Sequence, residues 1–255
     1  MSKRTKFIIT SSLLSLGFFS LGFISNQFRY PGIFILSLVT IVLFSWSLWE
    51  TLGKNATILS LLLPPMYTLG VGLFWFLLPS SIFATFPVIV LYGVGVYVLV
   101  STYNIFNVST FKKIALSRAA NGVGFVLTLF TIFLLCDAVL SLRLGIILRV
   151  PIIFLISFPL FLQGLWISHL TTKITREVFL YALTFAVGVA SISAVTFFWP
   201  LTITFGSLLL TVTSYVLLGL GQAQFEGRLF KTTIREYLLV GTLVFVFMVL
   251  ATSWR

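Results

Sequence analysis

The sequence predicts an all-α fold, a polytopic transmembrane helical bundle of about nine spans. Three observations predict it: the composition, a series of long apolar runs, and the placement of the basic residues. Of the 255 residues, 59% are hydrophobic and only 8% are charged, whereas a soluble domain carries about a quarter charged residues. A β-barrel would instead show alternating segments of about ten residues. We therefore expect residues 1–255 to form a single membrane domain.

Each apolar run is close to the roughly 20 helical residues that cross a hydrocarbon core about 30 Å thick. The first run follows Lys3, Arg4 and Lys6 and lacks a small-x-small cleavage site, which favours a retained span over a signal peptide. The nine predicted spans are 7–25, 32–49, 57–78, 83–103, 122–142, 148–168, 178–198, 201–220 and 237–253.

The basic residues predict an orientation. With the N-terminus in the cytoplasm, 12 of the 16 Lys and Arg residues lie in inside segments and four lie outside. This bias follows the positive-inside rule. We expect a multi-pass protein of the cytoplasmic (plasma) membrane with a cytoplasmic N-terminus and an outside C-terminus.

The net charge of +11 does not indicate nucleic-acid binding, because the basic residues are scattered between apolar runs instead of clustered on one face. The longest connections, 104–121 and 221–236, are both basic. Residues 104–121 have helical spacing of apolar positions opposite Lys112, Lys113 and Arg118. This pattern predicts either an amphipathic helix on anionic headgroups or an ordinary charged loop.

An internal repeat is predicted from an alignment of the sequence with itself. Residues 29–49 align with 149–169 at six of 21 positions, including Arg29 with Arg149 and Trp46 with Trp166. We expect a parallel 4+4 repeat plus one terminal helix, with repeat A at 1–110, repeat B at 111–226 and the ninth span at 227–255. Parallel repeats of this kind occur in some transporters; a chance match is the alternative.

Asp137 is the main candidate for a ligand- or ion-binding residue. It lies inside the fifth predicted span, where a carboxylate is costly. Its most reachable expected partner is Arg149 on the next span, followed by Arg143 in the turn. Asp137 and its arginine partner are interpreted either as a proton or cation site or as an ion pair that fixes two spans.

Breaks in the helical backbone are the other candidates. Interrupted membrane helices can line a cavity, and they also kink helices and let neighbours approach closely. The residues that form these breaks are Pro64, Pro65, Gly70, Gly72, Pro87, Gly93 and Gly95.

The remaining chemistry is sparse. Cys136 is the single cysteine and His169 the single histidine, so we expect neither a metal site nor a cofactor. No phosphate-binding Gly loop with Lys is present, which disfavours enzymes. We expect a non-enzymatic subunit or scaffold in a membrane complex, in contact with the lipid bilayer and membrane-protein partners. The alternative is a small-molecule, lipid or ion carrier with its site between the two repeats.

Overall fold

The computed structural model describes residues 2–52, 56–78, 82–109, 116–169 and 174–252. These residues form α-helices joined by short turns and one 3-10 helix, so the predicted all-α fold is confirmed. In chain order the elements are α1 (Lys3–Leu21), α2 (Asn26–Leu48), η1 (Ala56–Leu61), α3 (Leu63–Trp75), α4 (Ile82–Ser109), α5 (Ser117–Ser141), α6 (Ile146–His169), α7 (Arg176–Phe197), α8 (Ile203–Phe225) and α9 (Lys231–Ala251).

Eight helices are long and apolar enough to cross a membrane, counted over the described ranges. They run from α2 to α9, and the second of the eight is formed by η1 and α3 together. The remaining helix, α1, has 19 residues but begins with Lys3, Arg4 and Lys6, which shortens its apolar part. The multi-pass character of the chain is therefore clear, while the crossing by α1 and the orientation of the termini stay predictions.

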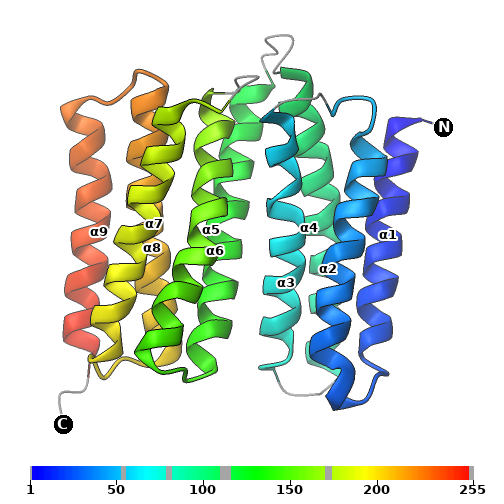
Figure 1. The fold of residues 1–255 in the computed structure, drawn as a ribbon, viewed down its shortest axis with the longest axis horizontal. Coiled ribbons are helices and arrows are strands. Elements are labelled where there is room, and N and C mark those ends of the chain that lie inside the picture. Colours follow the sequence, from blue (N-terminus) through cyan, green and yellow to red (C-terminus); the bar gives the residue numbers. More distant parts are fainter. Residues whose placement is uncertain (1, 53–55, 79–81, 110–115, 170–173, 253–255) are drawn as a thin grey trace. The chain divides into compact units, whose positions relative to one another are not determined.

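The chain divides into two compact units, Met1–Leu127 and Thr128–Arg255, with the division inside α5. Within each unit the helices lie side by side and alternate in direction (Figure 1). In unit 1, α2, α3 and α4 all contact one another, and α1 packs on α2 and α4. In unit 2, α6, α7 and α8 all contact one another, and α9 packs on α8. The predicted repeat boundary between 110 and 111 lies outside the described residues.

A chain of buried hydroxyl groups joins three helices of unit 1. Thr68 of α3 lies 3.1 Å from the Thr40 hydroxyl of α2 and 3.0 Å from the Tyr92 hydroxyl of α4. All three side chains are buried. In a membrane an apolar side chain gains little by moving from lipid to a neighbouring helix, so hydrogen bonds of this kind and close packing hold the helices together.

Glycines lie at close helix contacts in the same unit. A β-carbon at Gly72 would collide with Ile33 of α2, and one at Gly95 would collide with Tyr67 of α3. Gly93 faces Ser15 of α1 in the same way. These glycines therefore let α2, α3, α4 and α1 approach closely, which is the packing interpretation of the predicted backbone breaks.

The prolines have local roles. Pro64 and Pro65 lie in the first turn of α3, directly after the 3-10 helix η1, where a missing N–H costs little. The predicted break in this span is thus a change from 3-10 to α-helix near its beginning. Pro87 is an exposed residue within α4; Gly70 is buried in α3.

The connection predicted at 104–121 is shorter than expected. Residues 104–109 continue α4 up to Ser109, and α5 begins at Ser117, with Arg118 exposed in its first turn. The prediction of one amphipathic helix over 104–121 is therefore wrong, because the two ends of this segment belong to α4 and α5. Lys112 and Lys113 lie outside the described residues.

One ion-pair cluster ties the beginning of α1 to the turn after α2. Glu50 accepts a hydrogen bond of 2.8 Å from Lys6 and lies 3.6 Å from the Lys3 ammonium group. The hydrogen bond and charge of Lys6, with Lys3 adding to them, hold the pKa of Glu50 below its usual value. The carboxylate therefore stays charged at neutral pH and keeps both contacts.

Replacing Thr68 by Val should destabilise unit 1 by about 1–2 kcal/mol, because Thr40 and Tyr92 would both lose a buried hydrogen-bond partner. The measurement is unfolding of the purified protein in mixed micelles by titration with a denaturing detergent. Thr184→Val is the matched control, since Thr184 is exposed and bonds only within its own helix. Equal stability of the two variants would contradict a structural role for the hydroxyl chain.

Candidate functional site

Polar side chains gather at one end of unit 2, which we call the Asp137 end. There α5 ends at Ser141, α6 begins at Ile146, α7 ends at Phe197 and α8 begins at Ile203. The alternation of helix directions brings these four termini to one level, at the bottom of the view in Figure 1. Polar residues within one turn or so of these termini can therefore meet, although they are far apart in sequence.

Asp137 is buried at this level, with 6% of its surface exposed. Its Oδ1 atom accepts a hydrogen bond of 3.0 Å from the Ser207 hydroxyl on α8. Ser141, one turn further along α5, donates to the Asp137 backbone carbonyl at 2.8 Å. The carboxylate is thus held by a hydroxyl group of another helix, and it joins α5 to α8.

Arg149 is held by hydroxyl groups as well. Its Nε atom donates to Ser193 Oγ at 3.2 Å and its Nη2 atom to Thr196 Oγ1 at 2.6 Å. The guanidinium carbon lies 5.9 Å from the centre of the Phe197 ring, within the range of a cation–π contact. Arg149 therefore joins the beginning of α6 to the last turn of α7.

The expected Asp137–Arg149 ion pair is not formed; both residues lie in the described part of the chain, and each is bonded to hydroxyl groups instead. Arg143 is not a partner of Asp137 there either. It is an exposed residue in the turn between α5 and α6, with a φ of 49°. In this turn its backbone N–H donates to the Leu140 carbonyl at 3.2 Å. The three candidates thus share one end of unit 2 without forming one charged cluster.

The sequence interpretation missed the three hydroxyl partners. Ser193 and Thr196 are three residues apart, so both face the same side of α7, and both are buried. Ser207 is buried near the beginning of α8. Serine and threonine are common throughout the spans, and only the pairing of helix ends indicates which of them face a charge.

An apolar groove lies beside the Asp137 end, between α7, α8 and α9. Its volume is about 400 Å³, and most of its lining is apolar. Its lining includes Thr196, which binds Arg149. Other polar, small or aromatic residues that line it are Trp199, Thr213, Gly241 and Thr242. Small residues and hydroxyl groups are typical of surfaces where membrane helices meet.

The chemical capacity of this region is limited. Among the described residues, no three His, Cys, Asp or Glu side chains come together in a way that could hold a metal ion. Cys136 is buried next to Asp137 and is not in a disulfide. The arrangement provides one buried carboxylate and one guanidinium group, each engaged with hydroxyl groups, beside an apolar groove.

Residues 31–251 match a protein family described as a protein of unknown function (DUF5656). The chain belongs to this DUF5656 family. The matched region begins within α2 and ends with α9, so it contains the whole Asp137 end and the groove. No curated protein and no solved structure matches the chain.

Replacing Ser207 by Ala should lower the stability of unit 2 by about 1–3 kcal/mol, because the buried Asp137 carboxylate loses the hydrogen bond that the Ser207 hydroxyl donates to it. Detergent-titration unfolding measures the loss. Ser191→Ala removes an exposed hydroxyl that bonds only within α7, and should have little effect. If the two alanine variants are equally stable, Ser207 does not hold Asp137.

Proposed function

We propose that this member of the DUF5656 family is a non-enzymatic subunit or scaffold of a membrane complex. It acts by packing against a transmembrane helix of a partner protein in the groove between α7, α8 and α9. The observation that carries the proposal is the groove itself, an apolar space of about 400 Å³ beside the little-covered helix α9. The protein would work through shape and helix contacts and would transform no substrate.

The burial of the spans supports this assignment. Only 6% of the most apolar stretch of α9 is buried within the protein, whereas the corresponding stretches of the other seven spans are between 28% and 61% buried. Within unit 2, α9 contacts α8 and little else. A span that adds so little to the core of its own unit gains packing and close contacts when another helix lies beside it.

The engagement of the charged groups also supports a scaffold. A substrate site needs polar groups that converge on a space. Here the Asp137 and Arg149 side chains bond to hydroxyl groups of neighbouring helices, and the groove beside them is lined mostly by apolar side chains.

Val195→Trp should fill the groove and reduce binding of a partner at least ten-fold, since Val195 is an exposed lining residue of α7. The measurement is the stoichiometry of proteins that remain bound to the tagged chain after extraction in a gentle detergent. Leu180→Trp, on the same helix but outside the groove, should keep the partner. A clean monomer from the wild-type chain would count against the whole proposal.

Asp137 is the observation that favours the alternative function, an ion carrier. Its carboxylate is buried and joined to a second helix, as a coupling site would be. A carrier would bind and release a proton or cation at Asp137 as α5 and α8 move. A structural Asp137 would not.

The two functions separate in a flux assay with the chain in vesicles, a proton gradient and an internal pH-sensitive dye. For a scaffold we expect the wild type and Asp137→Asn to give the same response. Glu177→Gln is the control for loss of an acid, because Glu177 is exposed in the first turn of α7. A wild-type flux that disappears in Asp137→Asn but not in Glu177→Gln would establish the carrier.

A further inference from the structure

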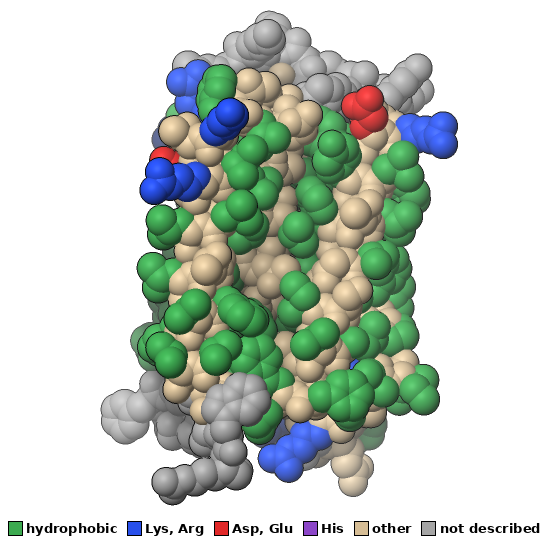
Figure 2. All heavy atoms as spheres, turned by 90° about the vertical axis from the view of Figure 1, so that its left-hand side faces the viewer, with side chains coloured by type: hydrophobic (Ala, Val, Ile, Leu, Met, Phe, Trp, Pro, Cys, Tyr) green, Lys and Arg blue, Asp and Glu red, His purple; other side chains and the backbone are tan. Residues whose placement is uncertain are grey.

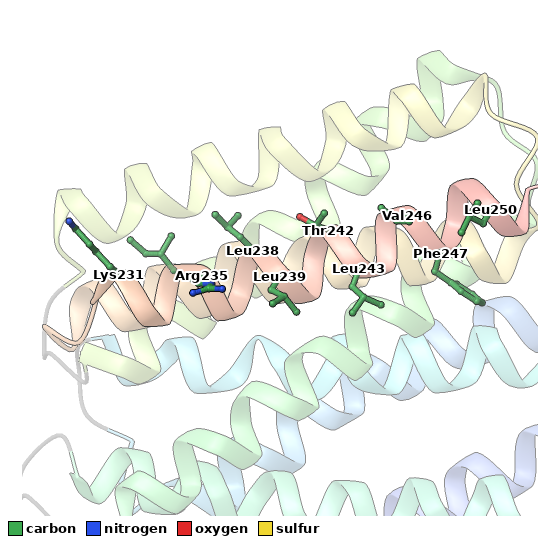
Figure 3. A pocket seen from close by; sticks show the side chains of 10 residues that line it. Lys231, Arg235, Leu238, Leu239, Thr242, Leu243, Val246, Phe247 and Leu250 are labelled. Atoms are coloured by element: carbon green, nitrogen blue, oxygen red, sulfur yellow. The ribbon is translucent and has the colours of Figure 1, made fainter.

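A second, open and shallow groove of unit 2 runs along the outer face of α9 and is lined by side chains of this helix alone. It extends from Lys231 at the beginning of the helix to Leu250 near its end, and we call this face the α9 stripe. Its apolar side chains form two rows with a spacing of four residues, one of them through Leu239, Leu243 and Phe247 (Figure 3). Figure 2 shows the side of the molecule that carries α9, with apolar side chains over its middle and most of the Lys and Arg side chains toward its upper end.

The charges of the α9 stripe lie at one end only. Lys231 and Arg235 are four residues apart, so they share one face at the first turns of α9, and both line the groove. Within the described part of the chain neither one forms an ion pair. Glu236 follows Arg235 but does not line the groove.

Three other basic residues near the ends of helices have acidic partners, whereas Arg118 and Arg176 form no ion pair among the described residues. Lys3 and Lys6 share Glu50, and Arg228 pairs with Glu226. Lys231 and Arg235 lie one turn apart on the same face of α9 and form a site of positive charge that no described acidic residue neutralises. Both side chains lie on the same face of α9 as the apolar side chains of the stripe, so the positive charge directly adjoins an apolar surface.

We propose that the α9 stripe binds an anionic phospholipid, with its phosphate at Lys231 and Arg235 and an acyl chain along the groove. An amphiphile of this kind matches the separation of charge and apolar surface. Eight residues of helix separate Arg235 from Leu243, a rise of about 12 Å at roughly 1.5 Å per residue. The part of the α9 stripe from Arg235 to Leu243 is thus about as long as one leaflet of a hydrocarbon core about 30 Å thick, and the stripe continues beyond it to Leu250.

The same charges disfavour a second copy of the chain as the occupant. Two copies inserted in the same direction would place Lys231 and Arg235 against the Lys231 and Arg235 of the other copy. The net charge of +11 adds to this repulsion. A phospholipid with a negative headgroup is attracted to both cations instead, and each basic side chain near an anionic surface strengthens binding about five-fold.

The test uses the full chain in phosphatidylcholine vesicles that contain a small fraction of a photoactivatable lipid with a diazirine in its acyl chain. The lipid has either a phosphatidylglycerol or a phosphatidylcholine headgroup, and mass spectrometry of peptides locates the labelled residues. We expect the phosphatidylglycerol probe to label Leu239 and Leu243 preferentially, since these two residues line the α9 stripe and not the α7–α8–α9 groove. Lys231→Ala and Arg235→Ala should each reduce this preference about five-fold, and the double variant about 30-fold.

Arg176→Ala is the matched control, because Arg176 is an exposed residue at the same end of unit 2 and does not line the groove. It should leave the labelling of the α9 stripe unchanged. Equal labelling by the two headgroups would mean that ordinary lipids cover the stripe, and it would overturn the proposal. A preference that survives in the double variant would overturn it as well.

The same labelling in native membranes tests the other occupant, a partner helix. If neither lipid reaches Leu239 and Leu243 there while a protein cross-links to them, the α9 stripe is a protein interface and the lipid site is refuted. The proposed subunit function is judged separately by Val195→Trp, since Val195 lies in the α7–α8–α9 groove and outside the α9 stripe.

Discussion

The hydrocarbon core of a bilayer provides no hydrogen bonds, so every backbone N–H and C=O group that crosses it must be bonded within the protein. Each helix meets this requirement by itself through its own backbone hydrogen bonds. Little force then holds the helices together, because lipid is as apolar as a leucine side chain. The chain responds with close approaches at glycine and with hydrogen bonds between hydroxyl groups. Gly72 against Ile33 and Thr68 between Thr40 and Tyr92 are the examples in unit 1. In unit 2 glycines such as Gly219 also allow a close approach, and hydroxyl groups bind charged side chains.

The fold could be predicted from the sequence because hydropathy and helix length act locally. All nine predicted spans coincide with helices, and residues 198–202 separate α7 from α8, close to the gap between the predicted spans 178–198 and 201–220. Boundaries were less certain: α4 continues to Ser109, beyond its predicted end at 103, because nothing in the apolar pattern marks the last polar turns of a helix. The third span begins as a 3-10 helix, which a hydropathy pattern cannot distinguish from an α-helix.

The candidate site was less predictable, because its contacts are long-range. The sequence indicated that Asp137 needs a partner, and the most reachable charge on the next span was Arg149. The partner is Ser207, and Arg149 binds Ser193 and Thr196 instead. Serines and threonines are abundant, so only the packing of helix ends identifies these three. The internal repeat stays a prediction.

The pairing of Asp137 with Ser207 also constrains biogenesis. The two residues are 70 positions apart, and at about 5–20 residues per second roughly 4–14 seconds of synthesis separate them. During that interval α5 is available to the insertion machinery while α8 does not yet exist. Until α8 is made, the Asp137 carboxylate lacks the hydroxyl group that it bonds in the folded protein, and an unpaired carboxylate in lipid is costly. The contact that joins α5 to α8 can therefore form only late in synthesis.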